Sequence, residues 1–141
     1  MSTEDNKALA RRFFAEVVTG GNLALVEDIF AASVTFNGRP AGHETIKQVV
    51  ANTRTAFPDI EVIIEDQVAE GDKVTTRRTF RGTHLGEYVT PWGRVPPTGK
   101  RVEWRLLSIV RFVDAKIVED WVVPDTLGLL QQLGAKVTLP G

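Results

Sequence analysis

Residues 101–125 read RVEWRLLSIVRFVDAKIVEDWVVPD, and this stretch decides the fold of the chain. Two runs rich in β-branched and aromatic residues, Arg101–Val113 and Lys116–Val123, flank a short polar turn at Asp114-Ala115. Two such runs separated by two turn residues are typical of a β-hairpin. The stretch therefore predicts two long, paired antiparallel strands.

Alternation along the first of these strands separates an apolar face from a charged one. Side chains alternate across a strand, so one face carries Val102, Trp104, Leu106, Ser108, Val110 and Phe112. We expect this face to point inward, with Ser108 as its only hydroxyl. The second strand carries Asp120 among Ile, Val and Trp, and burying a carboxylate is costly unless it is paired or neutralised. Asp120 is therefore the first candidate for a functional residue.

The composition narrows the class of protein. The chain has 141 residues, the size of one domain, so residues 1–141 are expected to form a single domain. It has no cysteine, which excludes disulfides, a thiol nucleophile and a thiolate metal site. The net charge of −1 argues against nucleic acid as a partner, and no apolar run approaches the ~20 residues of a membrane span. The acidic start, with no apolar signal segment after it, makes a cytoplasmic protein the expectation.

Helical periodicity and turn residues divide the remainder of the chain. We expect helices from Ser2 to the Gly20-Gly21 pair, from Asn22 to Phe30, from His43 to Phe57 and over Thr126–Leu133. The expected strands are Ser33–Asn37, Ile60–Glu70 and Lys73–Thr83, followed by a long loop over His84–Lys100. Helices followed by a run of strands indicate an α+β fold, with helices on one face of a curved, mainly antiparallel sheet. Such a sheet can enclose one apolar cavity for a small ligand.

Arginines are concentrated on two of the predicted strands, at positions 77, 78, 81, 101, 105 and 111. The interpretation favoured here is an outer sheet face on which Glu and Asp pair with them across the strands.

Several segments together resemble the SnoaL-like polyketide cyclase family of the NTF2-like (nuclear transport factor 2-like) superfamily. They are Phe57-Pro58-Asp59, Gly71-Asp72-Lys73-Val74, the run from Arg81 to Glu87, Pro96–Lys100, Lys116–Trp121, and Asp125 through Gly134. The resemblance implies a cone-shaped α+β barrel around an apolar cavity, a homodimer, and ring closure of a polyketide by intramolecular aldol chemistry without a cofactor. Relatives in the family act as ester cyclases, isomerases or hydroxylases.

The chain departs from the pattern of the aldol cyclases at three positions that are polar in them. By the resemblance, the catalytic aspartate falls at Val122, a facing histidine at Ser108 and a nearby glutamine at Leu106. Aldol closure needs a base for the proton alpha to a carbonyl and a donor for the enolate oxygen. Valine supplies neither, so another residue has to do so if the protein is an enzyme.

Asp120 is the nearest replacement, since it lies two positions from Val122 and hence on the same strand face. If a bulge accompanies the hairpin turn, Asp120 faces the cavity opposite Ser108, where burial would raise its pKa. The alternative remains that Asp120 points outward and pairs with an arginine, because Ile117, Trp121 and Val123 form a rival apolar face. His84, at the start of the long loop, is a second proton-transfer candidate, and its alternative is a histidine that holds loop backbone in place.

The remaining candidates are ligand contacts. Trp104, Leu106, Val122 and Phe36 are expected on the cavity wall, and Tyr88 and Trp92 of the long loop at its mouth. Two histidines without acidic ligands at metal spacing give no metal signal. No cofactor is expected.

Two functions stay open at this point. The first is a cofactor-independent cyclase or isomerase of a polyketide-like or similar hydrophobic small molecule, with Asp120, His84 and Ser108 as its catalytic residues. The second is a non-catalytic small-molecule-binding protein of the same fold, favoured by Val122 at the family's aspartate position. In either case Leu107, Ile109 and Trp121 on the outer face predict a homodimer through the sheet.

Overall fold

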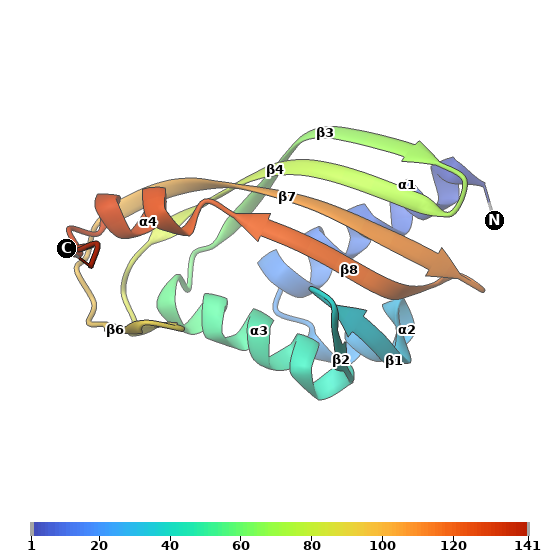
Figure 1. The fold of residues 1–141 in the computed structure, drawn as a ribbon. Helices are drawn as coiled ribbons and strands as arrows, with labels where there is room; N and C mark the ends of the chain where they lie inside the picture. Colours follow the sequence, from blue (N-terminus) through green and yellow to red (C-terminus); the bar gives the residue numbers. More distant parts are fainter. Residues whose placement is uncertain (1, 141) are drawn as a thin grey trace.

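A computed structural model describes residues 2–140 and shows a six-stranded curved sheet with helices beneath it (Figure 1). The strands of the sheet are β1 (Phe30–Phe36), β2 (Arg39–Ala41), β3 (Glu61–Glu70), β4 (Lys73–Thr83), β7 (Arg101–Val113) and β8 (Lys116–Pro124). They lie in the order β2-β1-β8-β7-β4-β3, and every neighbouring pair is antiparallel except β1 with β8. The expected α+β fold with a mainly antiparallel sheet is confirmed.

The helices that precede β3 lie on the concave side of the sheet, as Figure 1 shows. They are α1 (Thr3–Arg12), the π-helical turn η1 (Phe13–Thr19), the 3₁₀ turn η2 (Leu23–Leu25), α2 (Val26–Ile29) and α3 (His43–Ala56). A short helix, α4 (Thr126–Gln132), follows β8 and begins at Asp125, whose carboxylate accepts a hydrogen bond from the Gly128 backbone N–H at 2.9 Å. Among residues 2–140, no helix is both long and apolar enough to cross a membrane.

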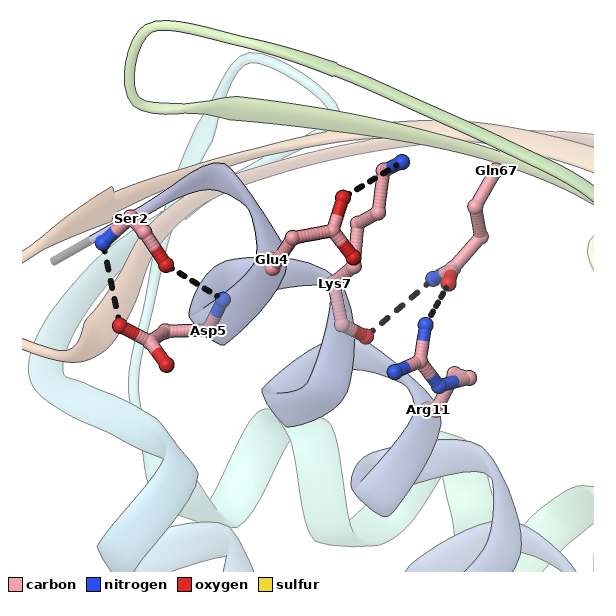
Figure 2. A network of polar contacts seen from close by, with 6 residues as sticks. All are labelled: Ser2, Glu4, Asp5, Lys7, Arg11 and Gln67. Carbon is pink, nitrogen blue, oxygen red and sulfur yellow. Dashed lines mark hydrogen bonds and ion pairs between the residues drawn. The ribbon is translucent and has the colours of Figure 1, made fainter.

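Helix α1 is held at its start by a cap and along its length by strand β3 (Figure 2). The Ser2 hydroxyl accepts from the Asp5 backbone N–H at 3.0 Å, and the Asp5 carboxylate accepts from the Ser2 N–H at 3.1 Å. Such a reciprocal cap satisfies two N–H groups that the first helical turn leaves without partners. Gln67 on β3 accepts from Arg11 at 2.8 Å and donates to the Lys7 carbonyl at 3.4 Å. The N-terminal helix is thereby fixed across one edge of the sheet.

The β7–β8 hairpin forms as the sequence predicts. Asp114 and Ala115 both have positive φ angles, 50° and 64°, as a two-residue turn between right-twisted strands requires. Along β7 the predicted inward face is buried at every position, and the residues between are exposed or half-buried. The hairpin is also bulged: Arg111 pairs with Glu119, but Phe112 pairs with Ile117, which leaves Val118 as the extra residue.

Three local expectations were wrong. The second helix is shorter than predicted, because Phe30 is the first residue of β1. The turn after β1 continues into β2, which no periodic pattern marks in three residues that include Pro40. The segment predicted as a loop contains a small separate hairpin, β5 (Tyr88–Thr90) with β6 (Gly93–Val95). Three-residue strands are too short for alternation to reveal them.

Candidate active site

A cavity of about 310 Å³ lies between the helices and the concave face of the sheet. Its size is at the lower end of the range that small-molecule sites usually have. Most of its wall is apolar and aromatic, with contributions from Phe13, Phe14, Val18, Phe36, Ile46, Val49, Val50, Phe80, Trp104, Leu106, Val122 and Pro124. Its polar wall is made by Asn37, Asn52, Thr53, Arg78, Tyr88 and Asp120. The site is therefore apolar, with a few hydrogen-bonding groups and two side chains, Arg78 and Asp120, that carry opposite charges when ionised.

Asp120 lies on the cavity wall and is only 8% exposed. The bulge at Val118 shifts the alternation of β8 by one residue, so that both Ile117 and Asp120 point inward and Trp121 points outward. Of the two interpretations of Asp120, the structure therefore shows the inward one. One detail differs from the expectation, because Asp120 pairs with Val110 rather than with Ser108, which pairs with Val122.

The surroundings of Asp120 favour its neutral form. Burial raises the pKa of its carboxyl to about 6, against the opposing attraction of the Arg78 guanidinium. No ion pair within 4.0 Å joins Asp120 to a cation among residues 2–140. A carboxyl group with a pKa near neutrality can both accept and return a proton, as a general acid/base must.

Arg78 is the functional candidate that the sequence analysis missed. It was placed on the outer face with the other arginines, but it lines the cavity and is only 6% exposed. Its Nη1 donates to the Ser108 hydroxyl at 2.7 Å, and its guanidinium carbon lies 4.4 Å from the centre of the Phe14 ring. Burial lowers the pKa of Arg78 to about 10, so the side chain stays charged at neutral pH.

The signal for Arg78 was present in the alternation of β4. Val74, Thr76, Arg78 and Phe80 share one face of this strand, and all four are buried.

Three of the arginines on the outer face of the sheet pair with carboxylates, as the sequence analysis expects. Arg77 pairs with Asp66 at 2.6 Å, Arg81 with Glu61 at 2.9 Å and Arg111 with Glu119 at 2.9 Å.

The predicted ligand contacts divide into those that reach the cavity and one that does not. Phe36, Tyr88, Trp104, Leu106 and Val122 all line it, although their role as ligand contacts stays a prediction. Trp92 is 77% exposed at the turn of the β5–β6 hairpin and lines a different hollow, beside the C-terminal segment. A turn residue of an outlying hairpin cannot face the main cavity, so Trp92 is left out of the proposed site.

His84 and Ser108 also lie differently from what their proposed roles require. His84 is 0% exposed and does not line the cavity; its Nδ1 and the Thr98 hydroxyl are 3.0 Å apart, and its ring packs 5.4 Å from that of Phe57. The backbone of His84 bonds Gly99 and Lys100, so the residue holds both ends of the long segment together. Ser108 lies behind the cavity wall and reaches it only through Arg78.

The amide side chains of the cavity were also missed, because asparagine in a turn or on a helix is commonplace. The Asn37 Oδ1 accepts from the Val122 backbone N–H at 2.8 Å, and its own backbone N–H donates to the Asp120 carbonyl at 2.9 Å. Asn37 thus fixes the backbone of β8 on both sides of Trp121. Within residues 2–140, no group of three or more His, Asp or Glu side chains is placed to hold a metal ion.

Comparison with known proteins places this geometry among related folds. The family described as SnoaL-like polyketide cyclase matches residues 8–133. The chain is 32% identical over 101 residues to the nogalonic acid methyl ester cyclase of Streptomyces nogalater, covering 70% of this chain and 71% of that one. It is 30% identical over 112 residues to the aklanonic acid methyl ester cyclase of Streptomyces peucetius, covering 77% and 73%. The crystal structure of AclR from Streptomyces galilaeus, described as a candidate hydroxylase, superposes with a TM-score of 0.82 at 30% identity, over 99% of this chain and 87% of that one.

The burial of Asp120 predicts a pH-dependent cost to stability. A carboxyl whose pKa is raised from 3.8 to about 6 on folding binds its proton more tightly in the folded state, so stability is lost as the pH rises through this window. Two pKa units correspond to about 3 kcal/mol. Asp120→Asn should therefore gain up to about 3 kcal/mol of unfolding free energy relative to the wild type between pH 4 and pH 7, measured by urea denaturation. A difference between the two proteins that does not change with pH would contradict the buried, proton-binding carboxyl.

Proposed function

This chain belongs to the SnoaL-like polyketide cyclase family, and from that premise we propose that it closes a ring in a polyketide-like small molecule by acid/base chemistry in the cavity. The observation that carries the proposal is the Asp120 carboxyl, buried on the cavity wall with a pKa raised to about 6. Both curated relatives are named as methyl ester cyclases, which makes an ester of a polyketide acid the first substrate class to test.

The proposed reaction is an intramolecular aldol closure. Asp120 in its ionised form removes the proton from the carbon alpha to a carbonyl, and the electron pair becomes an enolate. The enolate carbon attacks a second carbonyl of the same molecule, and the new alkoxide takes the proton back from Asp120. We propose that no cofactor takes part, because proton acceptor and proton donor are the same carboxyl in two states. An isomerase would use Asp120 in the same way, returning the proton to a different carbon without ring closure.

Val122 supports a second candidate function. It lines the cavity at the position where the family resemblance puts the catalytic aspartate, and a valine cannot transfer a proton. A non-catalytic binding protein of the same fold would need only the apolar wall. The two candidates differ in what they require of Asp120, since a binding protein does not need its proton.

The cyclase proposal predicts a large loss of turnover when the Asp120 carboxylate is replaced by a group that cannot accept a proton. Asp120→Asn keeps the side-chain shape, and loss of a general base typically costs 10²–10⁴-fold in rate. The assay is conversion of nogalonic or aklanonic acid methyl ester to ring-closed product, followed by chromatography. Asp66→Asn, on the outer face of β3, is the matched control and should leave the rate within about twofold. Substrate binding without turnover in the wild type would favour the binding protein.

We propose in addition that two copies of the chain associate through the outer sheet face. Leu107 and Ile109 on β7 and Trp121 on β8 are exposed there, and neighbouring strands bring them side by side. Light scattering should give twice the 15.6 kDa chain mass at micromolar concentration. Ile109→Lys should shift the protein toward monomer by placing a charge in the proposed interface, whereas Val89→Lys, on the β5–β6 hairpin, should not. A wild-type monomer would contradict this proposal.

A further inference from the structure

The Arg78 guanidinium has more hydrogen-bond donors than partners. A guanidinium carries five N–H donors, but only Nη1 has a hydrogen-bond partner among residues 2–140, the Ser108 hydroxyl, and Nε is buried without one. Buried cations are normally paired with an anion, because desolvating an unpaired charge is costly. Arg77, Arg81 and Arg111 on the outer face each pair with a carboxylate, whereas the buried Arg78 does not. The proton-transfer role of Asp120 does not explain why Arg78 is buried without an anionic partner.

The net charge of the cavity lining depends on whether Asp120 is protonated. Arg78 from β4 and Asp120 from β8 are the only charged side chains among the described lining residues, and Tyr88 from β5 is the only other titratable one. The residues that line the cavity from η1, α3, β1 and β7 are uncharged. When Asp120 is ionised the cavity is neutral, and when Asp120 is protonated it carries one positive charge. A ligand with one negative charge therefore restores neutrality only if Asp120 takes up a proton.

We propose that Arg78 is the anion-binding group of this cavity, and that the ligand is a fused-ring molecule with an acidic enol or phenol, held as its oxyanion at Arg78 while Asp120 carries the proton. The proposal rests on the proposed function in that it takes this cavity as the active site. The proton balance is internal and matches the state that the proposed reaction reaches after proton removal: the proton lies on the Asp120 carboxyl, and the negative charge lies on a ligand oxygen that faces the same cavity. The total charge of the cavity stays zero throughout.

The shape and chemistry of the wall favour this ligand class over other anions. Phe14, Phe80 and Trp104 supply flat apolar surfaces, and Arg78 itself lies over Phe14. A single cation balances one negative charge but not a phosphate, and the cavity volume of about 310 Å³ suits two or three fused rings rather than a long chain. Ser108 acts as a positioning residue, since its hydroxyl accepts from Nη1 and fixes one arm of the guanidinium.

The test is the pH dependence of binding of a stable acidic enol. The probe is 2-hydroxy-1,4-naphthoquinone, which is ionised throughout the range from about pH 6 to pH 8, and its methyl ether is the neutral control. Binding is followed by tryptophan fluorescence or calorimetry. Anion binding should weaken by up to about tenfold per pH unit above about pH 6 in the wild type, because Asp120 must gain a proton. Binding of the methyl ether should not depend on pH.

Variants separate the roles of the two charges. Arg78→Gln should weaken binding of the anion by about 10- to 100-fold, as expected for loss of a charge-assisted hydrogen bond, and should leave the methyl ether within about twofold. Arg78→Lys keeps the charge and should retain most of the affinity, whereas Arg77→Gln on the outer face should change nothing. Asp120→Asn should make anion binding independent of pH.

Two results would overturn the proposal: anion affinity that does not respond to Arg78→Gln, or a pH slope that persists in Asp120→Asn. If Arg78→Gln no longer binds the neutral ether, its fold is damaged. The dependence of anion affinity on pH in Asp120→Asn is then the result that tests the proposal. The cyclase assay fails separately from this one. If the protein shows no turnover but binds the enolate through Arg78, the proposed reaction is wrong and the anion site stands. If the protein is a cyclase but binds the probe equally well without Arg78, the anion site is wrong and the proposed reaction stands.

Discussion

The buried carboxyl of Asp120 is the constraint on which the account of this site depends. It lies on the wall of an apolar cavity together with one buried guanidinium, and no direct ion pair joins the two among residues 2–140. Burial alone would keep Asp120 protonated, and the field of Arg78 opposes this, so the pKa of the carboxyl comes to about 6. An acid that is half-ionised at about pH 6 can accept and return protons near neutral pH, whereas a fully paired carboxylate is poorly suited to do so.

The strand order and register of the sheet bring Arg78 and Asp120 to the same cavity. Strands β4, β7 and β8 are adjacent, so Arg78, Ser108 and Asp120 come from three neighbouring strands. Without the extra residue at Val118, the alternation that buries Ile117 would turn Asp120 toward solvent. A single inserted residue thus decides whether the strand offers a carboxyl to the cavity. The helices then cover the concave face, and the low polarity of the interior strengthens the interaction between the two charges.

Much of this could be predicted from the sequence, and the failures have physical causes. The long strands, the hairpin turn and the inward face of β7 follow from alternation, because every second residue there is apolar except Ser108. The direction of Asp120 could not be decided, because a bulge leaves no mark in the residue pattern of β8. Arg78 was wrongly expected on the outer face, because its charge was given more weight than the alternation of side chains along β4. Val74 and Phe80 on the same side of the strand mark that face as buried. His84 was overvalued because residue type suggests chemistry, while its position against Phe57 and Thr98 depends on tertiary contacts.

The most direct test is a carboxyl-detected NMR titration that follows the Asp120 side chain in the wild type and in Arg78→Gln. The wild-type carboxyl should titrate with a pKa of about 6, and removing the guanidinium should raise that pKa further, because Arg78 favours the charged form. A wild-type Asp120 that titrates at its ordinary value of 3.8 would mean that it is solvated, and one that titrates below 3.8 would mean that it is paired. An Asp120 titration unchanged in Arg78→Gln would mean that the two charges do not share a site. Either result would contradict the central claim that an apolar cavity holds this acid in the field of a buried cation.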